Sequence, residues 1–106
     1  MAGSYDDWAE ERRSFYTEQL GRVLSALAKL SFSEKHWASA LKFGHEVLKE
    51  DPFREDMHRL IMKALAAQSN PAAVKKHFEE LTALLQGELG IEPAPETRRL
   101  YQELMN

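Results

Sequence analysis

Apolar side chains recur every three or four residues along most of the chain, which is the spacing of one face of an α-helix. The first such segment covers about residues 7–29. Charged side chains lie between its apolar positions, which are Trp8, Phe15, Leu20, Val23, Leu24, Leu27 and Leu30. We therefore expect an amphipathic helix that packs this apolar face into the core and leaves the charged face in solvent.

A second helix is expected to begin at Ser33 and to end near Lys49. Ser33 has the side chain of a good N-cap, and Phe32 before it is placed to pack on Trp37. The inner positions of this segment combine the large Trp37 ring with small residues such as Gly44, which allows a neighbouring helix to approach closely. The sequence therefore predicts a packing reason for Gly44.

Prolines and one glycine divide the rest of the chain into three more helices. Asp-Pro at residues 51–52 and Asn-Pro at residues 70–71 each offer a capping side chain followed by a proline, which is tolerated in a first helical turn. Gly90 suits a left-handed helix end, and Pro95 suits the start of a last helix. No segment shows the alternating pattern of a β-strand.

An internal repeat relates the first two pairs of these helices. A shift of 33 residues places apolar or small residues on one another, namely Leu24 on Met57, Leu27 on Leu60, Ala28 on Ile61, Ala40 on Ala73, Leu41 on Val74 and Leu48 on Leu81. Helical hairpins with a period near 34 residues are typical of tetratricopeptide stacking. The predicted fold is therefore all-α, with about five helices in antiparallel hairpins stacked as a tetratricopeptide-like right-handed superhelix. Lys35 departs from that repeat, because it stands where the repeat usually has glycine.

The chain is long enough for one compact domain. We expect residues 1–5 to be a disordered N-terminus or a remnant of cloning, and residues 6–106 to form the domain. With 14 basic and 17 acidic residues the formal net charge is −3, which gives no general attraction to nucleic acid. No apolar run reaches the length of a membrane span, and residues 1–7 lack the features of a signal peptide. A cytoplasmic location is expected.

The sequence offers no convincing catalytic, metal or cofactor site. It contains no cysteine, and it lacks the glycine-rich loop of nucleotide-binding enzymes and the serine elbow of hydrolases. The four histidines, His36, His45, His58 and His77, are too widely spaced to form a helical pair of zinc ligands. We therefore expect no enzyme activity, no metal and no cofactor, and a protein as the partner.

Three segments resemble the bacterial transcriptional activator domain, the tetratricopeptide-like regulatory part of transcription factors of the Streptomyces antibiotic regulatory protein type. They are DWAEE at residues 7–11, DPFREDMHRL at residues 51–60 and ELGIEPAPE at residues 88–96. The last is similar to the family's common ending ELGIEPSPE and departs from it at Ala94. The resemblance extends from Asp7 to Glu103, nearly the whole chain.

The resemblance implies a non-enzymatic role in transcription regulation, through docking of a partner protein segment or through dimerisation. Family members usually carry a winged-helix DNA-binding domain before this region, which this sequence does not contain, so DNA binding is not expected of this chain. The alternative is a free-standing tetratricopeptide-like adaptor or scaffold unrelated to transcription.

A partner-binding groove is predicted by carrying over the exposed positions of the first helix of each tetratricopeptide hairpin. The residues are Arg22, Ser25, Lys29, Glu55, His58 and Met62. They combine charge, hydroxyl and thioether groups, which suits an amphipathic peptide or helix. Plain solvated surface is the alternative for the same positions.

Overall fold

The computed structural model describes residues 4–106, and within them it contains five α-helices and no strand. The helices are α1 (Ser4–Ser33), α2 (Trp37–Glu50), α3 (Glu55–Ala67), α4 (Pro71–Leu89) and α5 (Pro95–Met105). The all-α class and the five helices are therefore confirmed. Of the segment 1–5 that was expected to be disordered, residues 1–3 lie outside the described residues, and α1 begins at Ser4.

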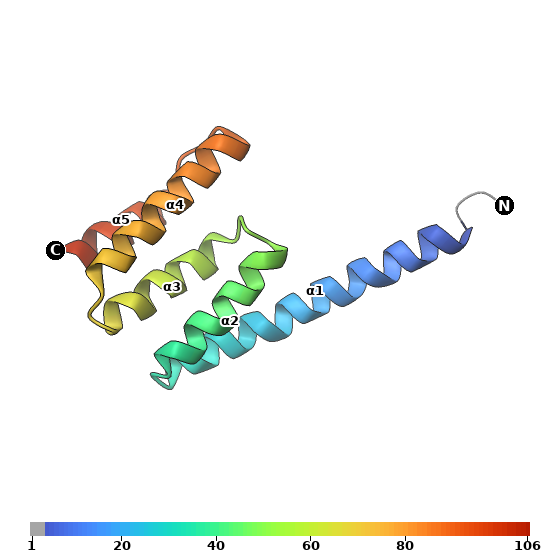
Figure 1. Cartoon of the computed structure of the whole chain (residues 1–106), viewed down its shortest axis with the longest axis horizontal. Coiled ribbons are helices and arrows are strands. Elements are labelled where there is room, and N and C mark those ends of the chain that lie inside the picture. The colour runs from blue at the N-terminus through green and yellow to red at the C-terminus, as the bar shows by residue number, and fades with distance from the viewer. Residues whose placement is uncertain (1–3) are drawn as a thin grey trace.

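The helices form an elongated stack (Figure 1). α1 and α2 make one antiparallel hairpin, α3 and α4 make the next, and α5 packs against both α3 and α4. α1 also contacts α3 directly, which joins the two hairpins. The right-handed superhelix stays a prediction. In the described part of the chain, no helix is long and apolar enough to cross a membrane.

The core lies where α2 and α3 meet their neighbours. Its buried members are mostly aliphatic and include Ala28, Ala40, Val47, Met57, Ile61, Ala64, Val74, Leu81 and Leu85. A Cβ atom added at Gly44 would lie 3.0 Å from Cγ1 of Ile61, so the glycine is what lets α2 and α3 approach this closely. The predicted packing reason for Gly44 is confirmed.

Three predicted helix boundaries are also confirmed. Asn70 caps α4, since its Oδ1 accepts a hydrogen bond of 3.2 Å from the backbone N–H of Ala73, and Pro71 occupies the first turn. α4 ends at Gly90, whose φ of +64° is left-handed. α5 begins at Pro95 as expected.

The predicted start of the second helix at Ser33 is wrong. Ser33 is the last residue of α1, and its hydroxyl donates to the carbonyl of Leu30 at 2.8 Å instead of capping a new helix. α1 continues for a further turn, and Phe32 in that turn packs edge-on against Trp37, with ring centroids 5.2 Å apart, as expected. α2 then begins at Trp37, after a turn in which Lys35 has a φ of +63°.

The predicted start of the third helix at residues 51–52 is wrong as well. Asp51 ends α2, with its N–H bonded to the carbonyl of Val47, and α3 begins three residues after Pro52, at Glu55. Pro52 lies in the connecting turn, where a missing N–H is equally harmless.

The predicted buried face of the first helix is the largest correction. Trp8, Phe15, Leu20, Val23, Leu27 and Leu30 are exposed, and only Leu24 of that set packs against the core. α2 has 14 residues against 30 in α1, so much of α1 has no neighbour. Where α2 does pack, it meets a side of α1 with small residues, Ser25 and Ala28, both of which are buried.

Candidate functional site

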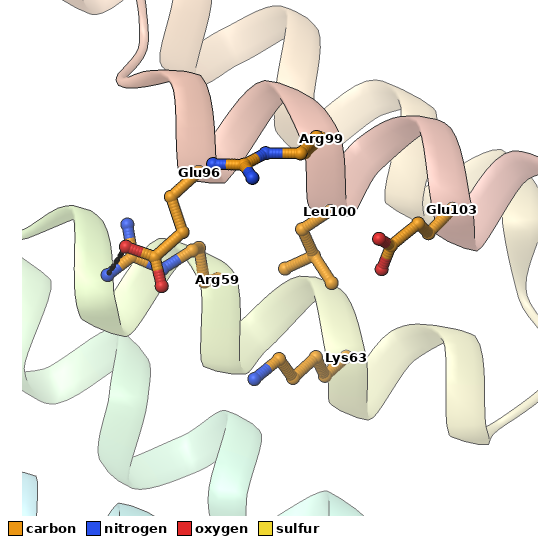
Figure 2. A pocket seen from close by; sticks show the side chains of 6 residues that line it. All are labelled: Arg59, Lys63, Glu96, Arg99, Leu100 and Glu103. Atoms are coloured by element: carbon orange, nitrogen blue, oxygen red, sulfur yellow. Dashed lines mark ion pairs between the residues drawn. The ribbon is translucent and has the colours of Figure 1, made fainter.

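A charged groove follows the exposed side of α3, between α1 and α5. Two adjoining hollows form it, and both include Arg59, Lys63 and Glu96. The hollow between α3 and α5 has a volume of about 400 Å³ and is drawn in Figure 2. The hollow toward α1 has about 300 Å³. We call these together the α3 groove, and its charged lining residues are Lys29, Asp56, Arg59, Lys63, Glu96, Arg99 and Glu103.

Helical spacing brings these side chains to one surface. Asp56, Arg59 and Lys63 on α3 are separated by three and four residues, and so are Glu96, Arg99 and Glu103 on α5. Residues with that spacing share one face of a helix. Because α3 and α5 pack together, the two charged rows face each other across the groove, as Figure 2 shows.

The groove carries four basic and three acidic side chains, and only some of them are paired. Arg59 lies 3.7 Å from a carboxylate oxygen of Glu96, and Lys29 lies 4.0 Å from Asp56. Lys63, Arg99 and Glu103 have no ion-pair partner among the described side chains of residues 7–106. The groove therefore offers two basic side chains and one acidic side chain to an incoming segment, with one positive charge in excess.

The α1 side of the groove is held by a guanidinium that links two helices. Arg54 donates to both carboxylate oxygens of Asp56, the shorter bond being 2.7 Å, and to the hydroxyl of the buried Ser25 at 3.1 Å. Partial burial alone would raise the pKa of Asp56, but the hydrogen bonds and the charge of Arg54, aided by Lys29, lower that pKa below its ordinary value. Asp56 thus stays ionised at neutral pH.

The α5 side is fixed by a buried polar network. The carboxylate of Glu55 accepts a hydrogen bond of 2.6 Å from the hydroxyl of Thr97 and one of 3.0 Å from the backbone N–H of Ala94. Arg59 donates to the same hydroxyl oxygen at 2.9 Å. Since Thr97 is fully buried, this network sets the distance between the two walls of the groove.

The six residues predicted for the groove are only partly at the surface. Lys29 lines the α3 groove, and Arg22 lines another hollow of about 500 Å³ between α1 and the end of α2. Ser25, His58 and Met62 are buried, and Glu55 is half-buried in the network with Thr97. The charged α3 residues that line the groove, Asp56, Arg59 and Lys63, each come one position after a predicted one, which corresponds to a rotation of about 100° around the helix.

Three histidines meet at the junction of α2, α3 and α4, which sequence spacing did not predict. His58 and His77 share a hydrogen bond of 2.8 Å between Nδ1 and Nε2, and the His58 Nε2–H donates to the carbonyl of Pro52 at 2.8 Å. Because Nε2 of a neutral His58 carries the hydrogen, its Nδ1 accepts the hydrogen bond from the Nε2–H of His77. The exposed ring of His45 lies 6.1 Å from that of His77, centroid to centroid.

Both inner histidines are held neutral. Burial lowers the pKa of His77 to about 4, with a further contribution from the neighbouring His58 and His45. Burial also lowers the pKa of His58, although its bond to the Pro52 carbonyl opposes the shift. Among the described side chains, those of residues 7–106, no group of three or more His, Asp or Glu is arranged to hold a metal ion. The junction is a structural contact between three helices.

Comparison with known proteins gives one match. The family model described as bacterial transcriptional activator domain matches residues 1–105. Searches of curated proteins and of solved structures each gave no match.

Proposed function

Since the chain belongs to the bacterial transcriptional activator domain family, we propose that it regulates transcription by docking a protein segment in the α3 groove. The docked segment carries both acidic and apolar side chains. The domain acts in the cytoplasm without catalysis of its own, and contacts to DNA belong to another domain or protein.

The observation that carries this proposal is the excess of one positive charge in a groove with fixed walls, where Lys63 and Arg99 have no ion-pair partner. Lys63 and Arg99 can each take a carboxylate, while Leu100 between the charged rows offers an apolar contact. Surface ion pairs contribute little alone, about 0 to 1 kcal/mol each, but charge arrangement in a groove selects which partner binds. Because Glu55, Arg59 and Thr97 hold α3 and α5 together, the groove is preformed, which reduces the entropic cost of docking.

Site-specific photo-cross-linking tests the proposal. A photoreactive amino acid is placed at position 100 in the groove and, as a control, at position 79 on the exposed side of α4. In bacterial cells that produce the chain, position 100 should cross-link a transcription regulator or a subunit of the transcription machinery, and position 79 should not. Mass spectrometry of the cross-linked peptide then identifies the docked segment.

Charge reversal connects that contact to function. Lys63→Glu should abolish the cross-link at position 100 and change the transcription of the regulator's target genes. Lys75→Glu makes the same charge change on α4, outside the groove, and should leave both unaffected. The proposal fails if the cross-link survives Lys63→Glu, or if positions 79 and 100 give the same products.

The alternative function is a helical adaptor that takes no part in transcription. In that case Lys63→Glu would still abolish the cross-link at position 100, but the cross-linked partner would not be a transcription protein. The expression of the target genes would then be unchanged. The family match favours the first candidate.

A further inference from the structure

A separate apolar surface runs along α1, on a different side of that helix from the α3 groove. It consists of Tyr16, Leu20, Val23, Leu27 and Leu30, which we call the α1 stripe. All five side chains are exposed, from 36% for Leu27 to 63% for Tyr16. A monomeric protein rarely leaves so many large apolar side chains in one continuous row in water.

The spacing within the stripe is four, three, four and three residues. This is the heptad spacing of the seam along which two α-helices pair, because it keeps each apolar side chain facing the partner along the whole contact. The stripe covers two heptads, or about 21 Å of helix at about 1.5 Å per residue. The spacing of the stripe thus fits a second α-helix as its binding partner and not an irregular peptide.

The residues that border such a seam decide whether a helix can pair with its own copy. In heptad terms these positions are Thr17, Gln19, Leu24, Ala26 and Ser31, and none of them is charged. Two identical stripes can therefore meet without repulsion between like charges. The partner chemistry that fits best is the same stripe on a second chain.

We propose that α1 pairs with α1 of a second copy through the α1 stripe, in parallel orientation. In that register each of the five residues faces its own equivalent. An antiparallel pair in which the heptad positions of the two helices still face each other would instead place Leu30 against Arg13 of the second copy, or Tyr16 against Glu34. Only the parallel register buries the whole stripe against apolar side chains.

The size of the stripe sets the expected strength. Five partly exposed side chains expose a few hundred Å² of apolar surface, so two stripes together bury several hundred Å², which is below the ~1,200 Å² at which specific, stable interfaces begin. The dimer should therefore be weak, with a dissociation constant in the micromolar range. It uses a different surface from the α3 groove, so the two proposals can fail separately.

Light scattering coupled to size exclusion tests the pairing. The mass should rise from 12.2 kDa toward twice that value as the concentration increases from about 5 to about 200 μM. Val23→Glu should weaken dimerisation at least tenfold, because it places two carboxylates at the centre of the seam. Ile91→Glu is the matched control, since Ile91 is about as exposed as Val23 and lies outside the stripe. Circular dichroism should show native helicity and melting for both variants.

Cysteine substitution tests the register. The chain has no cysteine, so a disulfide formed by Val23→Cys under mild oxidation can only join two copies. The parallel register predicts efficient cross-linking by Val23→Cys and none by Ile91→Cys. A chain that stays monomeric at about 200 μM, or a dimer that Val23→Glu leaves intact, would overturn the pairing. A dimer that Val23→Cys does not cross-link would overturn the parallel register.

Discussion

At the scale of single residues, two turns hold side-chain-bearing residues in left-handed backbone conformations. Lys35 between α1 and α2 has a φ of +63°, and Ser69 between α3 and α4 has a φ of +58°. For an L-residue this conformation costs about 1 to 2 kcal/mol, and glycine avoids that cost. Both turns therefore contain local strain that the packing of the hairpins outweighs.

Lys35→Gly should consequently stabilise the protein. The expected gain in the free energy of unfolding is about 0.5 to 1 kcal/mol. It is smaller than the strain that is removed, because glycine loses more conformational entropy than lysine when the chain folds. Urea denaturation measures it as a higher midpoint with an unchanged slope. A matched substitution at another exposed lysine, Lys42→Gly inside α2, should lower the midpoint, because it reduces the free energy of unfolding by about 1 kcal/mol. Equal effects at both positions would contradict the proposed strain.

Residue-scale signals predicted some helix boundaries and not others. Asn70 followed by Pro71 and the glycine at position 90 mark boundaries that are correct. Asp51 followed by Pro52 has the same chemistry as the first of these signals, but Asp51 ends α2 and does not begin α3. Ser33 can cap a helix or bond within one, and here its hydroxyl donates to the carbonyl of Leu30 in its own helix.

At the scale of elements, α5 is held to α4 by one aromatic stack. The rings of Phe78 and Tyr101 lie 4.0 Å apart, centroid to centroid, and are nearly parallel at 3°. Because Phe78 is half-buried, Phe78→Ala should cost about 2 to 3 kcal/mol, less than the 3 to 5 kcal/mol of a fully buried ring. A double-mutant cycle with Tyr101→Ala should give a coupling of about 1 kcal/mol. A coupling of zero would contradict the stack.

The buried hydroxyl group of Thr97 contributes to the hold of α3 on α5, together with the Ala94 N–H bond to Glu55 and the ion pair of Arg59 with Glu96. Thr97→Val keeps the shape of the side chain but leaves Glu55 and Arg59 each without one hydrogen-bond partner. The expected loss in the free energy of unfolding is about 1 to 3 kcal/mol. Thr82→Val is the control, because the Thr82 hydroxyl only bonds to a carbonyl of its own helix, at 2.8 Å, and its loss should cost less. Differential scanning calorimetry of both variants measures the difference.

Element-scale prediction failed for α1 for a physical reason. Periodicity identifies which side chains share a face, but it does not say whether a neighbour covers that face. The side of α1 that packs on α2 carries small residues, Ser25 and Ala28, and contributes little to an apolar pattern. The most hydrophobic face was therefore assigned to the core although it lies in solvent.

At the scale of the whole molecule, the histidine junction connects three helices and gives stability a dependence on pH. His77 has a pKa of about 4 in the folded chain and an ordinary value of 6.5. Between these values the unfolded chain binds a proton that the folded chain does not, so unfolding is favoured as the pH falls. His45, His58 and Glu80 are further titratable side chains at the junction, and the carboxylates of Glu55 and Asp56 act on His58 through their charge.

The free energy of unfolding should therefore decrease by about 1 kcal/mol per pH unit from pH 6.5 toward pH 4.5. Urea denaturation at several pH values measures this slope. In His77→Gln the amide can still donate to His58 but cannot titrate, so the slope should become clearly smaller. Asp56 does not affect this window, because its lowered pKa places its own loss of stability at more acidic pH. An unchanged slope in His77→Gln would contradict the burial of a neutral ring.

Only part of the candidate site could be predicted from the sequence. The repeat predicts that the first helix of each hairpin lines a common surface, and Lys29 on α1 shares a hollow with Asp56, Arg59 and Lys63 on α3. The rotation of α3 about its axis could not be obtained from the repeat, and a shift of one residue exchanges Met62, which is buried, for Lys63. The sequence did not predict that Glu96, Arg99 and Glu103 line the groove, because this depends on where α5 packs. The buried contact of Thr97 with Glu55 holds α5 in that position.

The unequal lengths of α1 and α2 imply a gradient of amide hydrogen exchange along a single helix. Amides near Ala28, which is in the core, should exchange only when the whole domain opens. Amides in the N-terminal part of α1, where the helix extends past the end of α2 (Figure 1), should exchange through fraying, many times faster. In a dimer the exchange of amides along the α1 stripe should slow as the concentration rises, while that of amides in α4 should not.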